Sequence, residues 1–120
     1  MSKINIKSIL KNENEIHIFE GKGIKNDNII TYNDNGVITK ISLGETIFLE
    51  RNQEYYIKLG FNTNKITEGT YSTKEGNFDV KVKTEYINKD KKSINIKYQL
   101  IINNSFIQNF EFYLQYTIDR

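Results

Sequence analysis

Few side chains in this 120-residue chain could do chemistry, and none falls in a recognisable catalytic spacing. His17 is the only histidine, and in the stretch EIHIFE it alternates with apolar residues as an ordinary strand residue does. Six serines are present, but none has the GxSxG context of a nucleophile elbow. The chain has no cysteine, which excludes disulfides, thiolate nucleophiles and cysteine-based metal sites.

Carboxylates are more numerous, and a pair of them could act as general acid and base, as in glycosidases. The candidates are Glu50, Glu54, Glu68, Glu75, Asp79, Glu85 and Glu111. Most fall in turns or at positions that a strand would turn outward, and an enzyme would need two of them to converge in a cleft. The segment GKG at 21–23 lacks the GxxxxGK[ST] spacing of a phosphate-binding loop. We therefore predict a protein without catalysis, metal or cofactor.

Apolar residues alternate with polar ones over most of the chain, which is typical of half-buried β-strands. The alternation is clearest in three rows at even positions: Phe78, Val80, Val82 and Tyr86; Ile94, Ile96, Tyr98, Leu100 and Ile102; Phe106, Phe110, Phe112, Leu114, Tyr116 and Ile118. The segments KDKK and NNS that join these rows are short enough for antiparallel hairpins. Upstream, the pattern predicts strands near 3–10, 15–23, 28–33, 37–43, 45–51, 54–61 and 65–73.

The composition supports the same fold. The chain has 20 Ile, 8 Tyr and 7 Phe but no Ala, which favours sheet over helix. Turns fall to Asn, Asp and Gly because there is no Pro, and Asn35-Gly36 is the strongest type I′ signal. Gly44 is either a turn or a bulge. We predict one all-β domain over residues 1–120, a single antiparallel up-and-down barrel of about 8–10 strands, since closure removes long apolar edges.

Polar side chains interrupt the inward rows of this predicted barrel. Tyr86, Tyr98 and Tyr116 point inward by parity, Gln108 interrupts the last row, and Arg51 shares the parity of Ile47 and Leu49. Buried hydroxyls need hydrogen-bond partners, and a barrel of this size can hold a small molecule. Two interpretations stay open: a filled core with satisfied polar groups, or a pocket for a small, partly apolar ligand.

Some apolar residues fall on the outward face, namely Ile87, Ile101, Ile107 and Tyr113. If they are contiguous, they could form a homodimer or partner interface, which is the alternative to an internal ligand. Lysines gather on the segment 81–97, but lysine on outward strand positions commonly serves solubility. A net charge of +2 does not argue for nucleic acid. We find no membrane span and no signal-peptide run, and we expect a cytoplasmic monomer or homodimer.

The order of several motifs resembles a known family. These motifs are TYND at 31–34, VITKI at 37–41, Arg51, LGF at 59–61, YSTKEG at 71–76 with FDVKVKT at 78–84, and INIKYQL at 94–100. In sequence and spacing they are similar to the YwiB-like family of small bacterial proteins. The chain differs at two turns, where no Pro follows Thr73 and Gln53 replaces a Gly. The resemblance implies a calycin-type, lipocalin-like barrel and no established activity.

Overall fold

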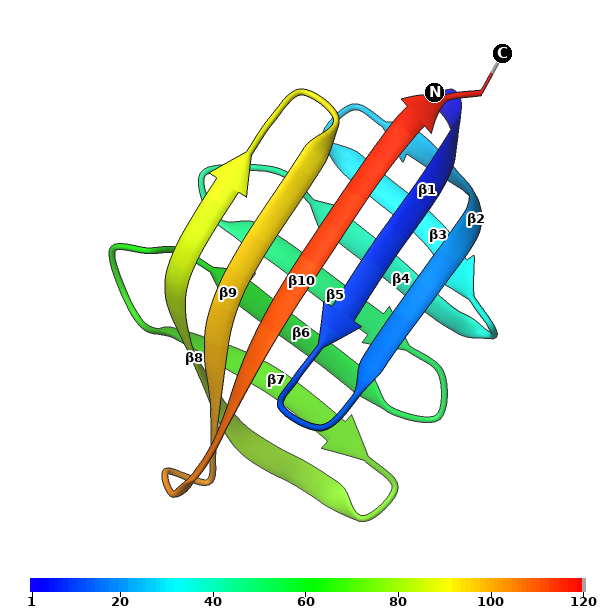
Figure 1. Cartoon of the computed structure of the whole chain (residues 1–120). Coiled ribbons are helices and arrows are strands. Elements are labelled where there is room, and N and C mark those ends of the chain that lie inside the picture. Colours follow the sequence, from blue (N-terminus) through cyan, green and yellow to red (C-terminus); the bar gives the residue numbers. More distant parts are fainter. Residues whose placement is uncertain (120) are drawn as a thin grey trace.

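Ten antiparallel strands form a closed barrel in the computed structural model, which describes residues 1–119 (Figure 1). In chain order they are β1 (Ser2–Lys11), β2 (Ile16–Asn26), β3 (Ile29–Asp34), β4 (Val37–Ser42), β5 (Ile47–Asn52), β6 (Tyr56–Phe61), β7 (Thr67–Thr73), β8 (Gly76–Lys89), β9 (Ser93–Ile102) and β10 (Phe106–Ile118). Each strand pairs with the next along the chain, and β1 pairs with β10 to close the ring. The predicted all-β, up-and-down barrel is confirmed. The part of the chain that the structure describes contains no helix long and apolar enough to cross a membrane.

Turns alternate between the two ends of such a barrel, because each strand reverses the direction of the one before. The β1–β2, β3–β4, β5–β6, β7–β8 and β9–β10 turns therefore share one end, and β1 begins and β10 ends at the other (Figure 1). The β7–β8 and β9–β10 hairpins reach furthest in this view, below the β1–β2 turn. We call the end that bears these five turns the hairpin end.

One face of every strand points into the barrel, as the period-two pattern predicted. Ile30, Ile41, Phe61 and Leu114 come from four different strands, and each is at most 1% exposed. The buried cluster continues with Ile4, Ile6, Tyr32, Ile47, Leu49, Leu59, Val80, Val82, Ile94, Ile96, Tyr98, Leu100, Phe112 and Tyr116. These side chains fill most of the interior with a packed apolar core.

The turns form at Asn and Gly residues, as predicted from the sequence. Asn35 and Gly36 have φ values of 53° and 96°, so both take the positive φ that a type I′ turn needs. Asn103 and Asn104, at the β9–β10 turn, also have positive φ. Gly44 lies in the connection between β4 and β5, so it is part of a turn and not a bulge inside one strand.

A β-bulge in β8 reverses the predicted orientation of two residues. The β8–β9 register shifts between Thr84 and Tyr86, so the residues after the bulge change face. Tyr86, predicted to point inward, is 40% exposed and lies on the outer surface. Ile87, predicted to point outward, packs instead against the core. Both predictions were wrong, because strict alternation does not allow for an inserted residue.

Gly23 on β2 faces the barrel interior where space is tightest. A Cβ at this position would lie 2.9 Å from the carbonyl oxygen of Thr31 and closer still to the side chain of Ile6. A larger residue would therefore push β2 away from its neighbours. The missing side chain lets β1, β2 and β3 pack closely at this point.

The β2–β3 seam is hydrogen-bonded along only part of its length. β2 pairs with β3 over Gly23–Asn26, whereas the preceding residues, 16–22, pair only with β1. Side chains bridge this opening. The ring of Phe19 stacks on Tyr32 with centroids 4.9 Å apart, and His17 reaches across from β2 to the end of β3.

Candidate functional site

A cavity of about 420 Å³ opens inside the barrel near its hairpin end. Glu15, in the β1–β2 turn, and Tyr55, in the β5–β6 turn, both line it, which places its opening at that end. Its walls come from β1 and from β5 to β10, and they carry Leu10, Leu49, Ile57, Leu59, Tyr71, Val80, Leu100, Ile102 and Phe110. Three of the predicted ligand-binding residues, Arg51, Tyr98 and Gln108, line the same cavity. The register of these seven strands therefore brings together residues that lie far apart in the sequence.

Arg51 is held at the cavity by a carboxylate from another strand. Its NH2 group donates a 3.1 Å hydrogen bond to Oδ2 of Asp34, at the end of β3. The Arg51 side chain is 16% exposed and that of Asp34 only 2%. The Nε–H of Arg51 is shielded from solvent and has no hydrogen-bond partner among residues 1–119. The hydrogen bond to Asp34 thus holds the guanidinium in place, and its Nε–H can still donate a further hydrogen bond.

His17, on the neighbouring strand β2, contacts the same carboxylate. Its Nε2 lies 3.0 Å from Oδ1 and 2.8 Å from Oδ2 of Asp34, and its side chain is 45% exposed. His17, Asp34 and Arg51 therefore form a chain of three groups from β2, β3 and β5, which we call the charged triad. The local pattern marks His17 as an ordinary strand residue, and it does not single out Asp34. The alternation of Ile30, Tyr32 and Asp34 was the signal that could have shown this aspartate to face inward.

Tyr98 contributes an aromatic face and a hydroxyl to the cavity. Its ring stacks on Phe110 with centroids 5.4 Å apart and tilts against Phe61 at 4.6 Å. Burial raises the pKa of the Tyr98 phenol strongly, and the positive charge of Arg51 offsets part of that effect. The hydroxyls of four other tyrosines donate hydrogen bonds, but within residues 1–119 that of Tyr98 has no partner. The Gln108 amide also lacks a protein partner in this part of the chain.

Tyr32 lies next to the charged triad without lining the cavity. Its hydroxyl donates a 3.3 Å hydrogen bond to Oγ of Ser8. Burial raises the pKa of this phenol, while the Ser8 contact and the charge of Arg51 lower it. Tyr32 is therefore a neutral group that packs the wall behind the triad.

Two of the predicted ligand-binding tyrosines do not reach the cavity. Tyr116 is buried, but its hydroxyl donates to the carbonyl oxygen of Lys91 at 3.0 Å, in the β8–β9 turn at the opposite end of the barrel. Tyr86 lies outside, where the Lys97 ammonium is 5.9 Å from its ring centroid. Parity alone could not show the position of a residue along the barrel axis.

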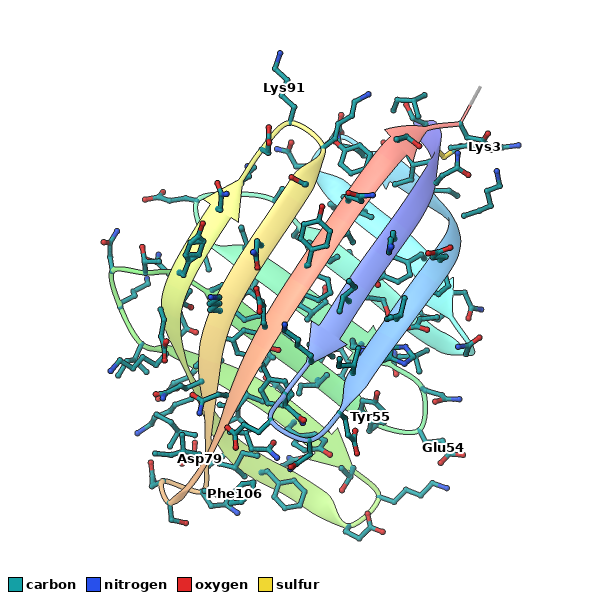
Figure 2. All side chains as sticks on the ribbon, viewed as in Figure 1. Lys3, Glu54, Tyr55, Asp79, Lys91 and Phe106 are labelled. Carbon is teal, nitrogen blue, oxygen red and sulfur yellow. The ribbon has the colours of Figure 1, made fainter. Side chains whose placement is uncertain are left out.

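Exposed aromatic residues lie at the hairpin end, where the cavity opens. Phe78 and Phe106 belong to inward-facing rows, yet they are 38% and 56% exposed. They lie near the tips of the β7–β8 and β9–β10 hairpins, and Figure 2 shows Phe106 and Tyr55 at this end. The ring of Tyr71 lies 5.2 Å from Phe78 and 6.4 Å from Tyr55, which makes a continuous apolar rim.

Other hollows lie on the outer surface of the strands. The largest, of about 600 Å³, is lined by Lys22, Ile24, Thr31, Ile38 and neighbouring residues of β2, β3 and β4. Within residues 1–119 no group of three or more His, Cys, Asp and Glu side chains could hold a metal ion. Glu15 is the one carboxylate among the described residues that line the internal cavity.

The four residues proposed for an outer interface do not form one patch. Ile101 and Ile107 are cross-strand neighbours, and Ile107 is 54% exposed. Tyr113 lies six residues further along β10, about 20 Å away at roughly 3.3 Å per residue, and pairs with Ile9. Since Ile87 points inward, the predicted continuous surface is absent.

Comparisons with known proteins agree with this fold. The sequence model of the domain of unknown function DUF1934 matches residues 4–114. The crystal structure of the ywiB protein from Bacillus subtilis superposes with a TM-score of 0.60 and 17% identity, covering 94% of this chain and 89% of that one. No curated protein matches. The chain belongs to the DUF1934 family, and the resemblance to YwiB-like proteins of unknown function is confirmed.

Proposed function

We propose that this DUF1934 protein binds a small, partly apolar molecule in the cavity at the hairpin end of its barrel. One observation carries the proposal. The largely apolar wall of the cavity carries Arg51, Tyr98 and Gln108, whose Nε–H, hydroxyl and amide have no protein partner among residues 1–119, and of these the Arg51 Nε–H is shielded from solvent. A protein that used this space only as core would gain stability by filling it or by pairing these groups.

The energetic argument has two parts. Burying a hydrogen-bonding group without a partner costs about 1–3 kcal/mol, so the shielded Nε–H of Arg51 is costly unless a ligand or water satisfies it. The volume of about 420 Å³ falls within the range of roughly 300–1,000 Å³ found for small-molecule sites. The exposed rings of Phe78 and Phe106 supply apolar surface at the opening, where a ligand would enter.

A neutral fluorescent probe, N-phenyl-1-naphthylamine, tests the site. We expect its emission to rise when it binds the wild-type protein. Gln108→Trp places a large ring in the cavity and should weaken binding about tenfold or more. Ile107→Trp, on the adjacent outward position of β10, is the matched control and should leave binding unchanged.

Circular dichroism would establish that both variants fold. The proposal fails if the probe does not bind the wild-type protein, or if the two variants bind it equally well. Cytoplasmic location, the choice between monomer and homodimer and a calycin-type relationship stay predictions, and the assay does not depend on them.

A further inference from the structure

One strand of the closed barrel has an edge that is unpaired over part of its length. β2 pairs with β1 from Ile16 to Lys25, but its other edge meets β3 only from Gly23 onward. We call residues 16–20 of β2 the open edge. No residue of β2 is fully buried, and within the open edge Ile16 and Ile18 are 67% and 55% exposed. The open edge is therefore accessible from outside the barrel.

Packed side chains hold this edge open. The ring of Phe19 stacks on Tyr32, and a Cβ added at Gly21 would lie 2.6 Å from the same ring. The imidazole of His17 contacts the carboxylate of Asp34 from the same part of β2. These side chains bridge the gap between the two strands, so β3 does not continue its pairing along the open edge. The gap is therefore a fixed feature of the fold.

The pairing with β1 shows which backbone groups face the open edge. The amide of Asn12 donates to the carbonyl oxygen of Glu15 at 3.0 Å, so these two residues are a hydrogen-bonded pair of the β1–β2 ladder. Bonded pairs alternate with non-bonded ones, so the odd-numbered residues of β2 bond to β1. The N–H and C=O groups of Ile16, Ile18 and Glu20 therefore point to the open edge, and they have no backbone partner among residues 1–119.

The open edge carries apolar side chains where free strand edges usually carry charges. Proteins protect such edges with lysine, proline or other charged residues, because free backbone groups beside apolar side chains attract another strand. Glu20 gives this protection at one end, and it pairs with Lys7 at 3.7 Å. Ile16 and Ile18 lack it, and Ile18 lies beside Ile9 of β1 on the outer face. An apolar row on the outer surface thus continues to the free edge.

We propose that the open edge pairs with the same edge of a second copy of this chain, as antiparallel strands related by a two-fold axis at His17. Ile16 then lies opposite Ile18 of the second copy, and the reverse pair is equivalent by symmetry. Both residues have free backbone groups, so the two pairs form four hydrogen bonds and bring four isoleucines together.

The surroundings of the open edge favour this register. Centring the pairing on a later residue would push the β1–β2 turn of the second copy against β3, which occupies the edge from Gly23 onward. Centring it on an earlier residue would place Ile18 opposite that turn instead of opposite an isoleucine. The contact is isologous and uses the same edge on both copies, so it forms a closed dimer and not a filament. This inference is independent of the proposed cavity function.

Sedimentation velocity of the purified chain, from about 10 µM to about 1 mM, tests the pairing. The paired segment is short, so we expect a weak dimer that dissociates on dilution. Ile18→Lys places a charge opposite Ile16 of the second copy and should weaken dimerisation about tenfold or more. Ile66→Lys is the matched control, since Ile66 is also 55% exposed but lies between β6 and β7, and it should dimerise as wild type.

Two further experiments test the backbone pairing and its register. Ile18→Pro removes an N–H that is free in the barrel but donates to the second copy, so the ladder to β1 stays intact while dimerisation is lost. The chain has no cysteine, so cysteines introduced singly report only on their own position. Ile16→Cys mixed with isotope-labelled Ile18→Cys should give mainly the mixed disulfide, because opposed Cα atoms lie about 5.5 Å apart and identical positions roughly 8 Å apart.

Each result decides for or against the second copy. A dimer that Ile18→Lys weakens and Ile66→Lys does not, together with a predominant mixed disulfide, supports the pairing. A monomer at every concentration overturns it, even if a peptide or another protein's strand binds the open edge. A dimer that both lysine variants leave unchanged, or a mixed disulfide no more abundant than random pairing gives, also overturns it. Wild-type sedimentation and the cysteine mixture decide the question even if Ile18→Pro does not fold.

Discussion

Replacing Asp34 by alanine should destabilise the barrel strongly, because it leaves Arg51 without its counter-charge. The Asp34 side chain is 2% exposed, and it accepts hydrogen bonds from Arg51 and His17. Removing one partner of a buried ion pair costs about 3–5 kcal/mol. We expect the lower end, about 3 kcal/mol, because Arg51 is 16% exposed and borders a cavity that water can enter.

This loss is large enough to measure in two ways. An unfolding entropy of about 2.1 cal/mol/K per residue is about 0.25 kcal/mol/K for 120 residues, so Asp34→Ala should lower the Tm by about 12 °C. Urea unfolding followed by circular dichroism at pH 7 gives the free energy of unfolding directly. Glu68→Ala removes a carboxylate from an exposed position on β7 and should cost less than about 0.5 kcal/mol.

A double variant separates the charge from the packing. Asp34→Asn combined with Arg51→Gln removes both charges and keeps a polar amide at each position, so it should cost less than Asp34→Ala alone. If Asp34→Ala proves no more harmful than Glu68→Ala, water already screens Arg51, and the ion pair does not stabilise the fold. That result would also remove the reason to regard the guanidinium as fixed at the cavity.

Three further predictions concern the barrel itself. Gly23→Ala should lower the free energy of unfolding by about 2 kcal/mol or more in urea unfolding, since no room exists for its Cβ; an unchanged value would mean that β2 moves freely. Tyr86→Ala should cost less than about 1 kcal/mol and Ile87→Ala about 2–3 kcal/mol in the same assay, because the bulge turns only Ile87 inward; the reverse order would contradict the register. The hydrogen bond to Glu50 raises the pKa of Tyr56 to about 12, so folding favours the neutral phenol. The stabilisation of the fold by this phenol is complete below about pH 10, and it is lost as the pH rises towards 12. In an NMR titration of Tyr56, Glu50→Gln should bring that pKa back towards 10, and an unchanged value would contradict the assigned cause.

The site was partly predictable because strand parity decides which side chains share the interior. Arg51, Tyr98 and Gln108 were assigned to the inside from alternation alone, and all three line the cavity. Parity failed for Tyr86, where one extra residue in β8 reverses the face. For Tyr116 the face was right, but its distance along the barrel axis was not encoded in any local pattern.

The charged triad was beyond a local analysis for a different reason. His17, Asp34 and Arg51 belong to three strands, and their contact depends on where the β2–β3 hydrogen bonding stops. It also depends on which residues of β2 face inward. These are the odd-numbered residues, whereas in β1 the even-numbered residues face inward. The length of the β1–β2 turn causes this change of parity, and alternation within one strand does not predict the parity of the next strand.

By itself, then, the sequence determined the all-β class, the strand order and most of the register, because a one-residue slip would bury lysines and expose isoleucines. It also determined the positive-φ turn at Asn35 and Gly36, which needs no distant contact. Only the tertiary structure decided which inward polar groups meet, where a cavity remains between them and which of their donors stay unpaired. These properties depend on the closure of the ring and on the relative axial positions of strands distant in sequence, which local propensities do not specify.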